Sequence, residues 1–389
     1  MPECDVETNL LGIFMRKVHI ALVGKQLAPV YNGIYAVLPD VVEFVYSVDS
    51  KTQMKELSYR SPCEVVKSDP LSPTDLTEIL SRARSLAEKY SSDEVTLNIS
   101  SGTKSWSHIF GIVFQPMENA TVMYLDQTGM LWDYRKMEGH PIQPMDMKTL
   151  LSLYGSGDRD VFTNLNEYTP ADTEARKKIE IIRRRFFKEF NELCTISNLD
   201  PLKTPSGSKT SKNGSVVKWE RGSNGNDDVV EFSFFKQPSP EIVAVSSPHA
   251  SLLAFKSGWF EYKVANILCF WKHSRNVYLN CRFKDDNDND KNEVDVIVET
   301  SSRLLFVECK TSLYESTDVD KFASVVKAYG GSGSLGIFIT DKPMNKKSYD
   351  KCITHGLLPP FSLKENHGGL LPTEALYQVL NSAISQINM

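Results

Sequence analysis

The chain has 389 residues, more than one ordinary hydrophobic core organises, so two or three domains are expected. Hydrophobic residues make up 41% and charged residues 24%, a composition that excludes a disordered chain. The formal net charge of −5 excludes a wholly cationic nucleic-acid binder but allows a local basic groove. No apolar run approaches the ~20 residues that span a bilayer, and the acidic first residues lack the pattern of a signal peptide.

Cysteine usage indicates a reducing compartment. The seven cysteines are scattered and odd in number, and none forms a CxxC pair. Neither a disulfide framework nor a zinc ribbon is therefore predicted, and a cytoplasmic protein is expected. The cysteines lie at positions 4, 63, 194, 269, 281, 309 and 352.

The first section alternates predicted strands and helices. A hairpin at the edge of a sheet is predicted from residues 122–125 and 131–134, which flank a turn. The β-α-β rhythm favours a parallel, Rossmann-like sheet, and we assign residues 1–155 to this α/β domain. Its predicted strands are 19–23, 41–46, 63–66 and 95–99, and its predicted helices are 29–38, 72–90 and 106–114.

The middle section, residues 156–240, is predicted to be a helical and loop connector. Its helix, residues 169–193, carries seven Lys and Arg residues between 176 and 188. A solvated helix face is the favoured interpretation of these charges, and contact with phosphates is the alternative. Residues 203–228, rich in Gly, Ser, Lys and Asn, are predicted to be a mobile loop or linker.

Residues 241–389 form a second predicted α/β module. We find no internal repeat. The predicted helices are 259–270, 320–329 and 372–387, and the predicted strands are 277–283, 293–298, 304–309 and 335–340.

The strongest chemical pattern lies between residues 293 and 310. Two β-branched runs flank Thr300-Ser-Ser-Arg303, which predicts a hairpin with a two-residue turn at Ser301 and Ser302. Cross-strand partners then have numbers that sum to 603. This register places Asp295 opposite Glu308.

The same register places Glu293 opposite Lys310, and period-2 alternation puts Cys309 on the other face. Carboxylates so close repel each other unless they are protonated or bridged by a cation, and hard oxygen ligands suit Mg²⁺ or Mn²⁺. The Cys309 main-chain carbonyl is a further candidate ligand. A metal beside a lysine suits phosphodiester hydrolysis, whereas the plainer alternative is a solvent-facing polar side of the hairpin.

The order of these residues resembles the PD-(D/E)xK nuclease superfamily. Glu261 matches the acid on a preceding helix, Asp295 the strand aspartate, and Glu308 and Lys310 the Glu-x-Lys of the next strand. Val294 stands where the motif has proline. The resemblance implies a restriction-endonuclease-like α/β/α fold, Asp295 and Glu308 as metal ligands, and Glu261 as a ligand directly or through a water.

A second pattern follows two predicted strands near the N-terminus. Ser100-Ser-Gly-Thr-Lys104 precedes a helix, and Gly24-Lys-Gln26 follows the first strand. Backbone N–H groups, a Thr hydroxyl and a Lys ammonium at a helix N-terminus suit an anion. The spacing is neither a P-loop nor a dinucleotide fingerprint, and a plain βα turn is the alternative.

These segments resemble the CRISPR-associated Rossmann-fold (CARF) sensor domain, which binds cyclic oligoadenylates across a homodimer dyad. Both ends together resemble the CRISPR ancillary nucleases that join a CARF domain to a PD-(D/E)xK domain. The resemblance implies a homodimeric, metal-dependent endonuclease that cyclic tetra-adenylate activates, that nicks DNA and that in some members cleaves single-stranded RNA. Alternatives are a CARF-type DNA-binding regulator without catalysis and a restriction-type nuclease that no nucleotide gates. The positions that match the CARF pattern are Gly24, Gln26, Ser101, Gly102, Thr103 and Lys104.

Overall fold

The computed structural model describes residues 15–385 apart from 127–128, 144, 155–159, 196–200, 224, 237, 286, 301–302, 312–314 and 331–333. The chain divides into two compact units, Met1–Met145 and Asp146–Met389. Within the described ranges, none of the helices combines the length and the apolar character that crossing a membrane needs. Cys4 lies outside the described residues.

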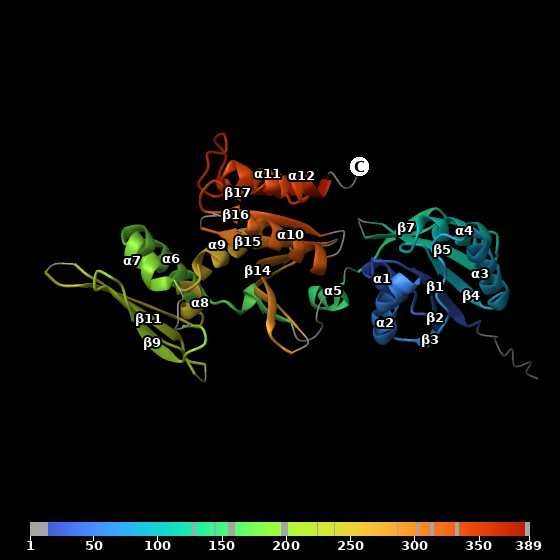
Figure 1. Ribbon diagram of the computed structural model, residues 1–389, viewed down its shortest axis with the longest axis horizontal. Coiled ribbons are helices and arrows are strands. Elements are labelled where there is room, and N and C mark those ends of the chain that lie inside the picture. The colour runs from blue at the N-terminus through green and yellow to red at the C-terminus, as the bar shows by residue number, and fades with distance from the viewer. Residues whose placement is uncertain are drawn as a thin grey trace, which may run out of the picture. The chain divides into compact units, whose positions relative to one another are not determined.

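The first unit is built on a seven-stranded sheet in the order β3-β2-β1-β4-β5-β6-β7 (Figure 1). β1 pairs in parallel with β2 and β4, and β4 pairs in parallel with β5. β6 and β7 run antiparallel at the edge, which confirms the predicted edge hairpin and extends it by one strand. The strands are β1 (Lys17–Val23), β2 (Val41–Tyr46), β3 (Glu64–Val66), β4 (Glu94–Asn98), β5 (Ala120–Leu125), β6 (Met130–Asp133) and β7 (Glu138–Pro141).

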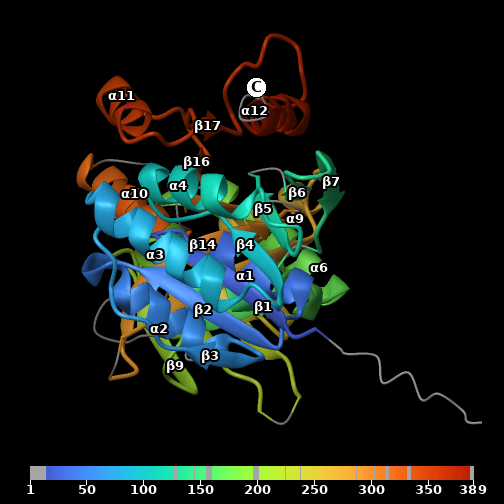
Figure 2. The ribbon, with the colours of Figure 1, turned by 90° about the vertical axis from the view of Figure 1, so that its right-hand side faces the viewer.

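Helices cover both faces of this sheet (Figure 2). α3 (Leu76–Lys89) and α4 (Lys104–Phe114) pack on one face through a core that includes Trp106, Phe110 and Phe114. α1 (Ala28–Val37) and α2 (Lys51–Arg60) follow β1 and β2. The sequence analysis missed α2 because Leu57 is its only fully buried side chain, so it lacks an apolar stripe.

The second unit contains a six-stranded sheet in the order β17-β16-β15-β14-β13-β8. β13, β14 and β15 form an antiparallel meander, whereas β15, β16 and β17 are parallel and share one carboxyl edge. Along β15, Leu305, Val307 and Cys309 enter one core, and Leu304 and Phe306 enter the other. The strands are β8 (Val161–Asn164), β13 (Asn276–Lys284), β14 (Asp290–Glu299), β15 (Leu304–Lys310), β16 (Leu335–Thr340) and β17 (Phe361–Ser362).

The two cores give this unit its α/β/α layering. Residues of α6 (Pro170–Arg185), α8 (Ala250–Ala254), α9 (Gly258–Cys269) and α12 (Pro372–Ser385) belong to one core. Residues of α5 (Met147–Tyr154), α10 (Thr317–Tyr329) and α11 (Lys346–Thr354) belong to the other.

The predicted loop at residues 203–228 is wrong where β9, β10 and the start of β11 lie, because a four-stranded antiparallel sheet begins there. Its order is β12-β11-β10-β9, with β9 (Ser206–Thr210), β10 (Val216–Glu220), β11 (Asp228–Phe234) and β12 (Glu241–Ser247). Gly207 pairs with Trp219, whose indole is 3% exposed. Small polar residues therefore form strands here because their neighbours supply the apolar face.

The single helix predicted over residues 169–193 is interrupted at Phe186, between α6 and α7 (Phe187–Cys194). Phe186 adopts φ −125°, ψ 49°, and its ring stacks on Phe234 of β11 at 4.1 Å between centroids. The interruption turns Phe186 onto the four-stranded sheet and leaves Phe187 46% exposed.

Ion pairs account for much of the basic charge on α6, and the solvated-face interpretation fits Lys177 and Arg185 but not Arg183, whose side chain is 11% exposed. The pairs are Arg176–Glu180 at 2.9 Å, Lys177–Glu174 at 2.7 Å, Arg183–Asp341 at 3.5 Å and Arg185–Glu241 at 2.7 Å.

Candidate functional site

The loops that follow β1 and β4 meet at the carboxyl edge of the first sheet. The Gly24 amide donates to the Ser101 hydroxyl at 3.0 Å, and that hydroxyl donates to the Gln26 carbonyl at 3.0 Å. A Cβ atom on Gly24 would lie 2.8 Å from the Gly102 nitrogen, closer than a side chain tolerates. Gly24 and Ser101 thus let two chain segments far apart in sequence touch backbone to backbone.

Lys104 begins α4 directly after these loops. Gly102 has φ +83°, and a Cβ there would lie 3.0 Å from the Leu22 Cβ. Thr103 caps the helix, since its hydroxyl accepts from the Trp106 amide at 3.1 Å. The cap brings Lys104 into the first helical turn, where the helix dipole favours an anion.

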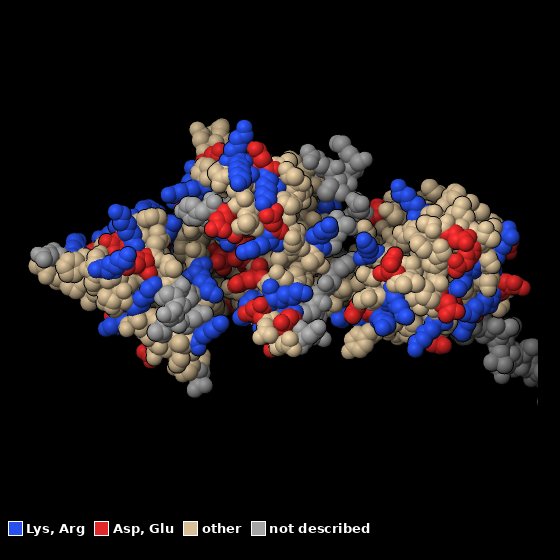
Figure 3. Space-filling view, viewed as in Figure 1, with Lys and Arg blue, Asp and Glu red and all other residues tan. Residues whose placement is uncertain are grey.

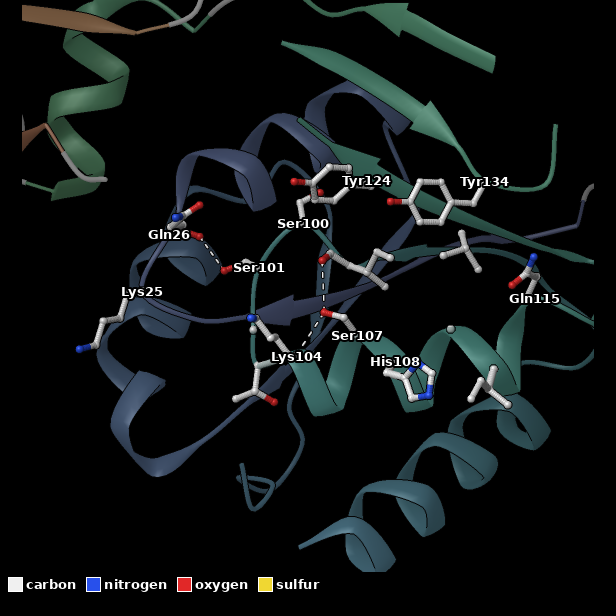
Figure 4. Close-up of a pocket in the computed structure, with 16 residues that line it drawn as sticks. Lys25, Gln26, Ser100, Ser101, Lys104, Ser107, His108, Gln115, Tyr124 and Tyr134 are labelled. Atoms are coloured by element: carbon white, nitrogen blue, oxygen red, sulfur yellow. Dashed lines mark hydrogen bonds between the residues drawn. The ribbon is translucent and has the colours of Figure 1, made fainter. Parts of the chain in front are cut away.

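A pocket of about 840 Å³ opens at this edge (Figure 4). Its wall contains five of the six residues that the sequence pattern singled out, whereas Gly24 lies behind Ser101 as support. The five are Gln26, Ser101, Gly102, Thr103 and Lys104.

The rest of the wall was not predicted. Ser107 and His108 of α4 and Gln115 at its C-cap line the pocket, as do Tyr124 of β5 and Tyr134 directly after β6 (Figure 4). The helix positions could have been found, because they follow Lys104 at helical spacing, opposite the buried aromatic face of α4. The two tyrosines, 6.1 Å apart between ring centroids, belong to the predicted edge hairpin, but its place beside the Lys104 loop follows only from the strand order of the folded sheet.

The pocket is chemically suited to a phosphorylated ligand with aromatic rings. Lys25 and Lys104 line it, and none of its described lining residues is Asp or Glu. Hydroxyl and amide groups supply neutral donors and acceptors, and the tyrosine rings offer flat apolar surface.

The second cluster of interest surrounds the β14–β15 hairpin. Val296 pairs with Val307 and Glu299 with Leu304, so the predicted register, in which partners sum to 603, is confirmed over four pairs. The predicted turn at Ser301 and Ser302 lies outside the described residues.

Beyond Val296 and Val307 the described ladder ends, which corrects the expectation that Asp295 and Glu308 face each other as a ladder pair. The Asp295 carboxylate instead accepts a hydrogen bond from the Cys309 amide at 2.7 Å. At the end of the hairpin, the Cys309 amide thus donates to the Asp295 side chain and not to a backbone carbonyl of β14.

The described ladder also stops short of Glu293 and Lys310, so their predicted pairing stays a prediction. Across the other edge of its strand, Glu293 lies opposite Arg282 of β13, and Lys310 lies beside Thr340 of β16. The Lys310 ammonium makes an ion pair with Glu308 at 2.7 Å, and their side chains are 33% and 16% exposed.

Glu261 lies in the first turn of α9 and completes an acidic group with Asp295 and Glu308. Burial raises the pKa of Glu261 well above its usual range, and the charges of Asp295, Glu293 and Glu308 raise it further. Burial and the Glu308 charge likewise hold the pKa of Asp295 well above the ordinary value.

Lys310 provides the positive charge of this group. Burial opposes that charge, but Glu308 and Asp295 together raise the pKa of the Lys310 ammonium. For Glu308, burial raises the carboxyl pKa and outweighs the lowering by Lys310. The structure therefore brings together all four residues of the predicted Glu-Asp-Glu-Lys motif, and Figure 3 shows acidic side chains gathered over α9 and β14.

The same carboxylates are the candidate metal ligands. Within the described ranges, no three His, Cys, Asp or Glu side chains are close enough to hold a metal ion by themselves. Asp295 and Glu308 supply hard oxygen donors of the kind that Mg²⁺ and Mn²⁺ take, and these cations keep several waters. Mutual repulsion raises the pKa of Asp295, and a divalent cation would relieve it. Asp295 and Glu308 therefore fit such a cation only if water molecules supply its remaining ligands.

Cys309 carries a thiol buried in the core, 4% exposed. Burial first, and then the Asp295 charge, raises the pKa of this thiol well above its usual range. A protonated, enclosed thiol is a poor nucleophile, which agrees with a packing role.

The chain combines a Rossmann-like unit with a restriction-endonuclease-like α/β/α unit. This fold class was predicted from the sequence, and likeness to solved structures confirms it. No protein-family model and no curated protein matches the sequence.

Three solved structures share this fold. Can2 from Sulfobacillus thermosulfidooxidans, solved with cyclic tetra-adenylate, has a TM-score of 0.64 at 15% identity, over 96% of this chain and 100% of its own. Protein VC1899 from Vibrio cholerae has a TM-score of 0.60 at 14% identity, over 96% and 98%. A type III CRISPR defence DNA nuclease activated by cyclic oligoadenylate has a TM-score of 0.54 at 17% identity, over 94% of this chain and 51% of that one.

Proposed function

We propose that this protein is a metal-dependent endonuclease of type III CRISPR defence, switched on by cyclic tetra-adenylate bound in the first unit. One observation carries the proposal: a single chain holds a lysine-lined pocket at the edge of a Rossmann-like sheet and a Glu261–Asp295–Glu308–Lys310 cluster on a second sheet. Solved proteins with the same fold were described with cyclic tetra-adenylate and as a cyclic oligoadenylate-activated DNA nuclease.

In the pocket, Lys104 and Lys25 would bind phosphates. The Gly24–Ser101–Gln26 hydrogen bonds would hold the backbone of both loops in place, so that little ordering is needed on binding. A ligand with near-twofold symmetry suits a homodimer, since each subunit presents the same loops once.

In the second unit, Asp295 and Glu308 would hold Mg²⁺ or Mn²⁺, with the Cys309 carbonyl as a further donor and Glu261 bound directly or through a water. A bound divalent cation lowers the pKa of its water and polarises a phosphoryl oxygen. The Cys309 amide orients Asp295 by donating to its carboxylate. Lys310 would release Glu308 and place its charge beside the attacked phosphate.

A cleavage assay tests this function. Supercoiled DNA and single-stranded RNA are incubated with the full chain, with and without cyclic tetra-adenylate, and with Mg²⁺, Mn²⁺ or a chelator. Cleavage is expected only when activator and metal are both present. Cleavage without activator would indicate an ungated restriction-type nuclease, and DNA binding without cleavage would indicate a regulator.

Variants locate the chemistry in the same assay. Asp295→Asn, Glu308→Gln and Lys310→Ala should each lower turnover at least about a hundredfold, as expected when one preorganised charged group is lost. Asp290→Asn, an exposed acid on the same strand that pairs with Lys284, is the matched control and should cleave normally. Normal cleavage by Asp295→Asn would overturn the assignment.

A further inference from the structure

The interruption of the α6–α7 helix exposes an aromatic ring between two cations. The Phe187 ring centroid lies 5.1 Å from the Arg183 guanidinium carbon and 5.8 Å from the Lys342 ammonium. The Phe187 side chain nevertheless remains 46% exposed. An uninterrupted helix would place residues 186 and 187 differently, so the break determines which of the two phenylalanines faces solvent.

This surface adjoins the acidic cluster through two elements. The Arg183 guanidinium lies 4.9 Å from the ring centroid of Trp259, which is two residues before Glu261 in α9. Arg183 also pairs with Asp341 at 3.5 Å, and the Asp341 amide donates to the Lys310 carbonyl at 3.0 Å. Arg183 thus links the aromatic ring to the two elements that carry Glu261 and Lys310, through Trp259 of α9 and through Asp341 after β16.

The charge of the surface is opposite to that of the cluster. Asp341 is 3% exposed at its side chain and is neutralised by Arg183 and by Lys364, which lies 2.9 Å away. Lys364 keeps 57% of its side chain exposed, and Lys342 is exposed as well. A polyanion that reaches the cluster gains a neighbouring place where its phosphates meet cations.

We propose that Phe187 and Lys342 form a docking platform for one unpaired nucleotide beside the cleaved phosphodiester. The base stacks on Phe187, and the adjoining phosphate contacts Lys342, with Arg183 positioning the ring. A duplex keeps its bases stacked on one another, so this platform selects single strands. The inference rests on the proposed nuclease function, and it applies to DNA and RNA strands because both offer a base and a phosphate.

Binding measured without cleavage tests the platform. Fluorescence anisotropy of labelled single-stranded DNA, single-stranded RNA and duplex DNA is followed with the full chain in chelator, with and without cyclic tetra-adenylate. Phe187→Ala should weaken binding of single strands at least about fivefold, the lower end for losing one base–aromatic stack. Phe187→Trp should restore it, and duplex binding should be unchanged by either substitution.

Matched surface variants serve as controls. Phe235→Ala removes a ring that is 59% exposed beyond β11, and Lys218→Gln removes an exposed charge on β10; both should bind as wild type. Lys342→Gln should lower the slope of log affinity against log salt by about 0.7, the value for one phosphate contact on a single strand.

Unchanged single-strand binding by Phe187→Ala, or equal losses for single strands and duplex, would overturn the platform. A chain that binds single strands through Phe187 yet cleaves nothing would support the platform and refute the nuclease proposal. If the wild-type chain cleaves and Phe187→Ala binds single strands normally, the nuclease proposal is supported and the platform is refuted. A stronger effect of Phe187→Ala on DNA than on RNA, or the opposite, identifies the favoured strand.

Discussion

Gly24 and Ser101 show how single residues build the pocket edge. The Ser101 hydroxyl joins the two loops by accepting from Gly24 and donating to Gln26. The loops approach so closely that Gly24 has no room for a side chain. Position 24 therefore requires glycine, because any side chain there would collide with backbone atoms of Gly102.

Gly24→Ala should lower the melting temperature by several degrees and weaken binding of cyclic tetra-adenylate, because the new methyl group pushes the two loops apart. Gly111→Ala is the contrast for the melting temperature alone, because Gly111 lines the pocket: a Cβ there meets nothing within 4 Å, and alanine favours the helix by up to about 1 kcal/mol. Thermal unfolding and calorimetry measure both. Equal melting temperatures for Gly24→Ala and wild type would show that the loops separate freely.

Glu261 gives a prediction about pH. The pKa of Glu261 is raised in the folded chain. Above pH 4.5, about the ordinary pKa of a glutamate, the unfolded chain has therefore lost this proton while the folded chain still holds it. Stability therefore falls as pH rises above that value. Glu261→Gln should stabilise the protein at pH 8 and change little at pH 4, measured as a difference in melting temperature.

Glu220→Gln, an exposed acid on β10, is the control and should show no such pH dependence. If Glu261→Gln shifts the melting temperature equally at both pH values, ionisation of the Glu261 carboxyl group does not destabilise the folded protein. The same scan with Mn²⁺ added should narrow the gap between wild type and Glu261→Gln, since the cation offsets the clustered negative charge.

Among the elements, the four-stranded sheet depends most on context. Gly207 lies opposite Trp219, and a Cβ on Gly207 would lie 2.3 Å from the indole ring. The indole fills the space that a side chain would occupy, so glycine here serves packing rather than flexibility.

Gly207→Ala should therefore lower the melting temperature by several degrees and change the fluorescence of Trp219, whereas Ser208→Ala, at the next position of β9, should do neither. Ser208 is exposed and lies opposite Lys218. If Gly207→Ala changes neither the melting temperature nor the Trp219 fluorescence, β9 does not pack against β10 in solution.

The elements that sequence predicted correctly carry their signal locally. The β14–β15 register followed from two β-branched runs and a short turn, and the first sheet followed from its strand-helix alternation. The break at Phe186 depends instead on Phe234, 48 positions later in the chain (234 − 186), against which Phe186 stacks. The described hairpin ladder likewise ends where the Cys309 amide donates to the Asp295 carboxylate. Contacts of this kind leave no mark on a local pattern.

For the whole molecule, we expect that activator bound in the first unit switches on cleavage in the second. We also expect that the affinity for the activator does not depend on the side chains of the cleavage site. Lys104→Ala should weaken cyclic tetra-adenylate binding about ten- to a hundredfold, the worth of one charged hydrogen bond, and saturating activator should restore much of the cleavage. Asp295→Asn should bind the activator as wild type does. Calorimetry and cleavage rates measured on both variants separate the two effects, and unchanged affinity in Lys104→Ala would move the activator site elsewhere.

Assembly is the remaining property at this scale. Light scattering of the purified chain should give twice the 43.8 kDa of one subunit, because a symmetric ligand suits a twofold pair of pockets. Gly111→Ala, which leaves the loops intact, should give the same mass. A chain that stays monomeric even with cyclic tetra-adenylate would contradict the dimer.

The hydrogen bond from the Asp341 amide to the Lys310 carbonyl has a consequence for how such a protein diversifies. Only main-chain atoms make this link, so it is indifferent to the identity of the side chains at positions 341 and 310. Positions 187 and 342 can therefore change while the strand that carries Glu308 and Lys310 keeps its place. Under the proposed function, the side chains that would contact a bound strand can vary without a change in the backbone of the proposed catalytic site.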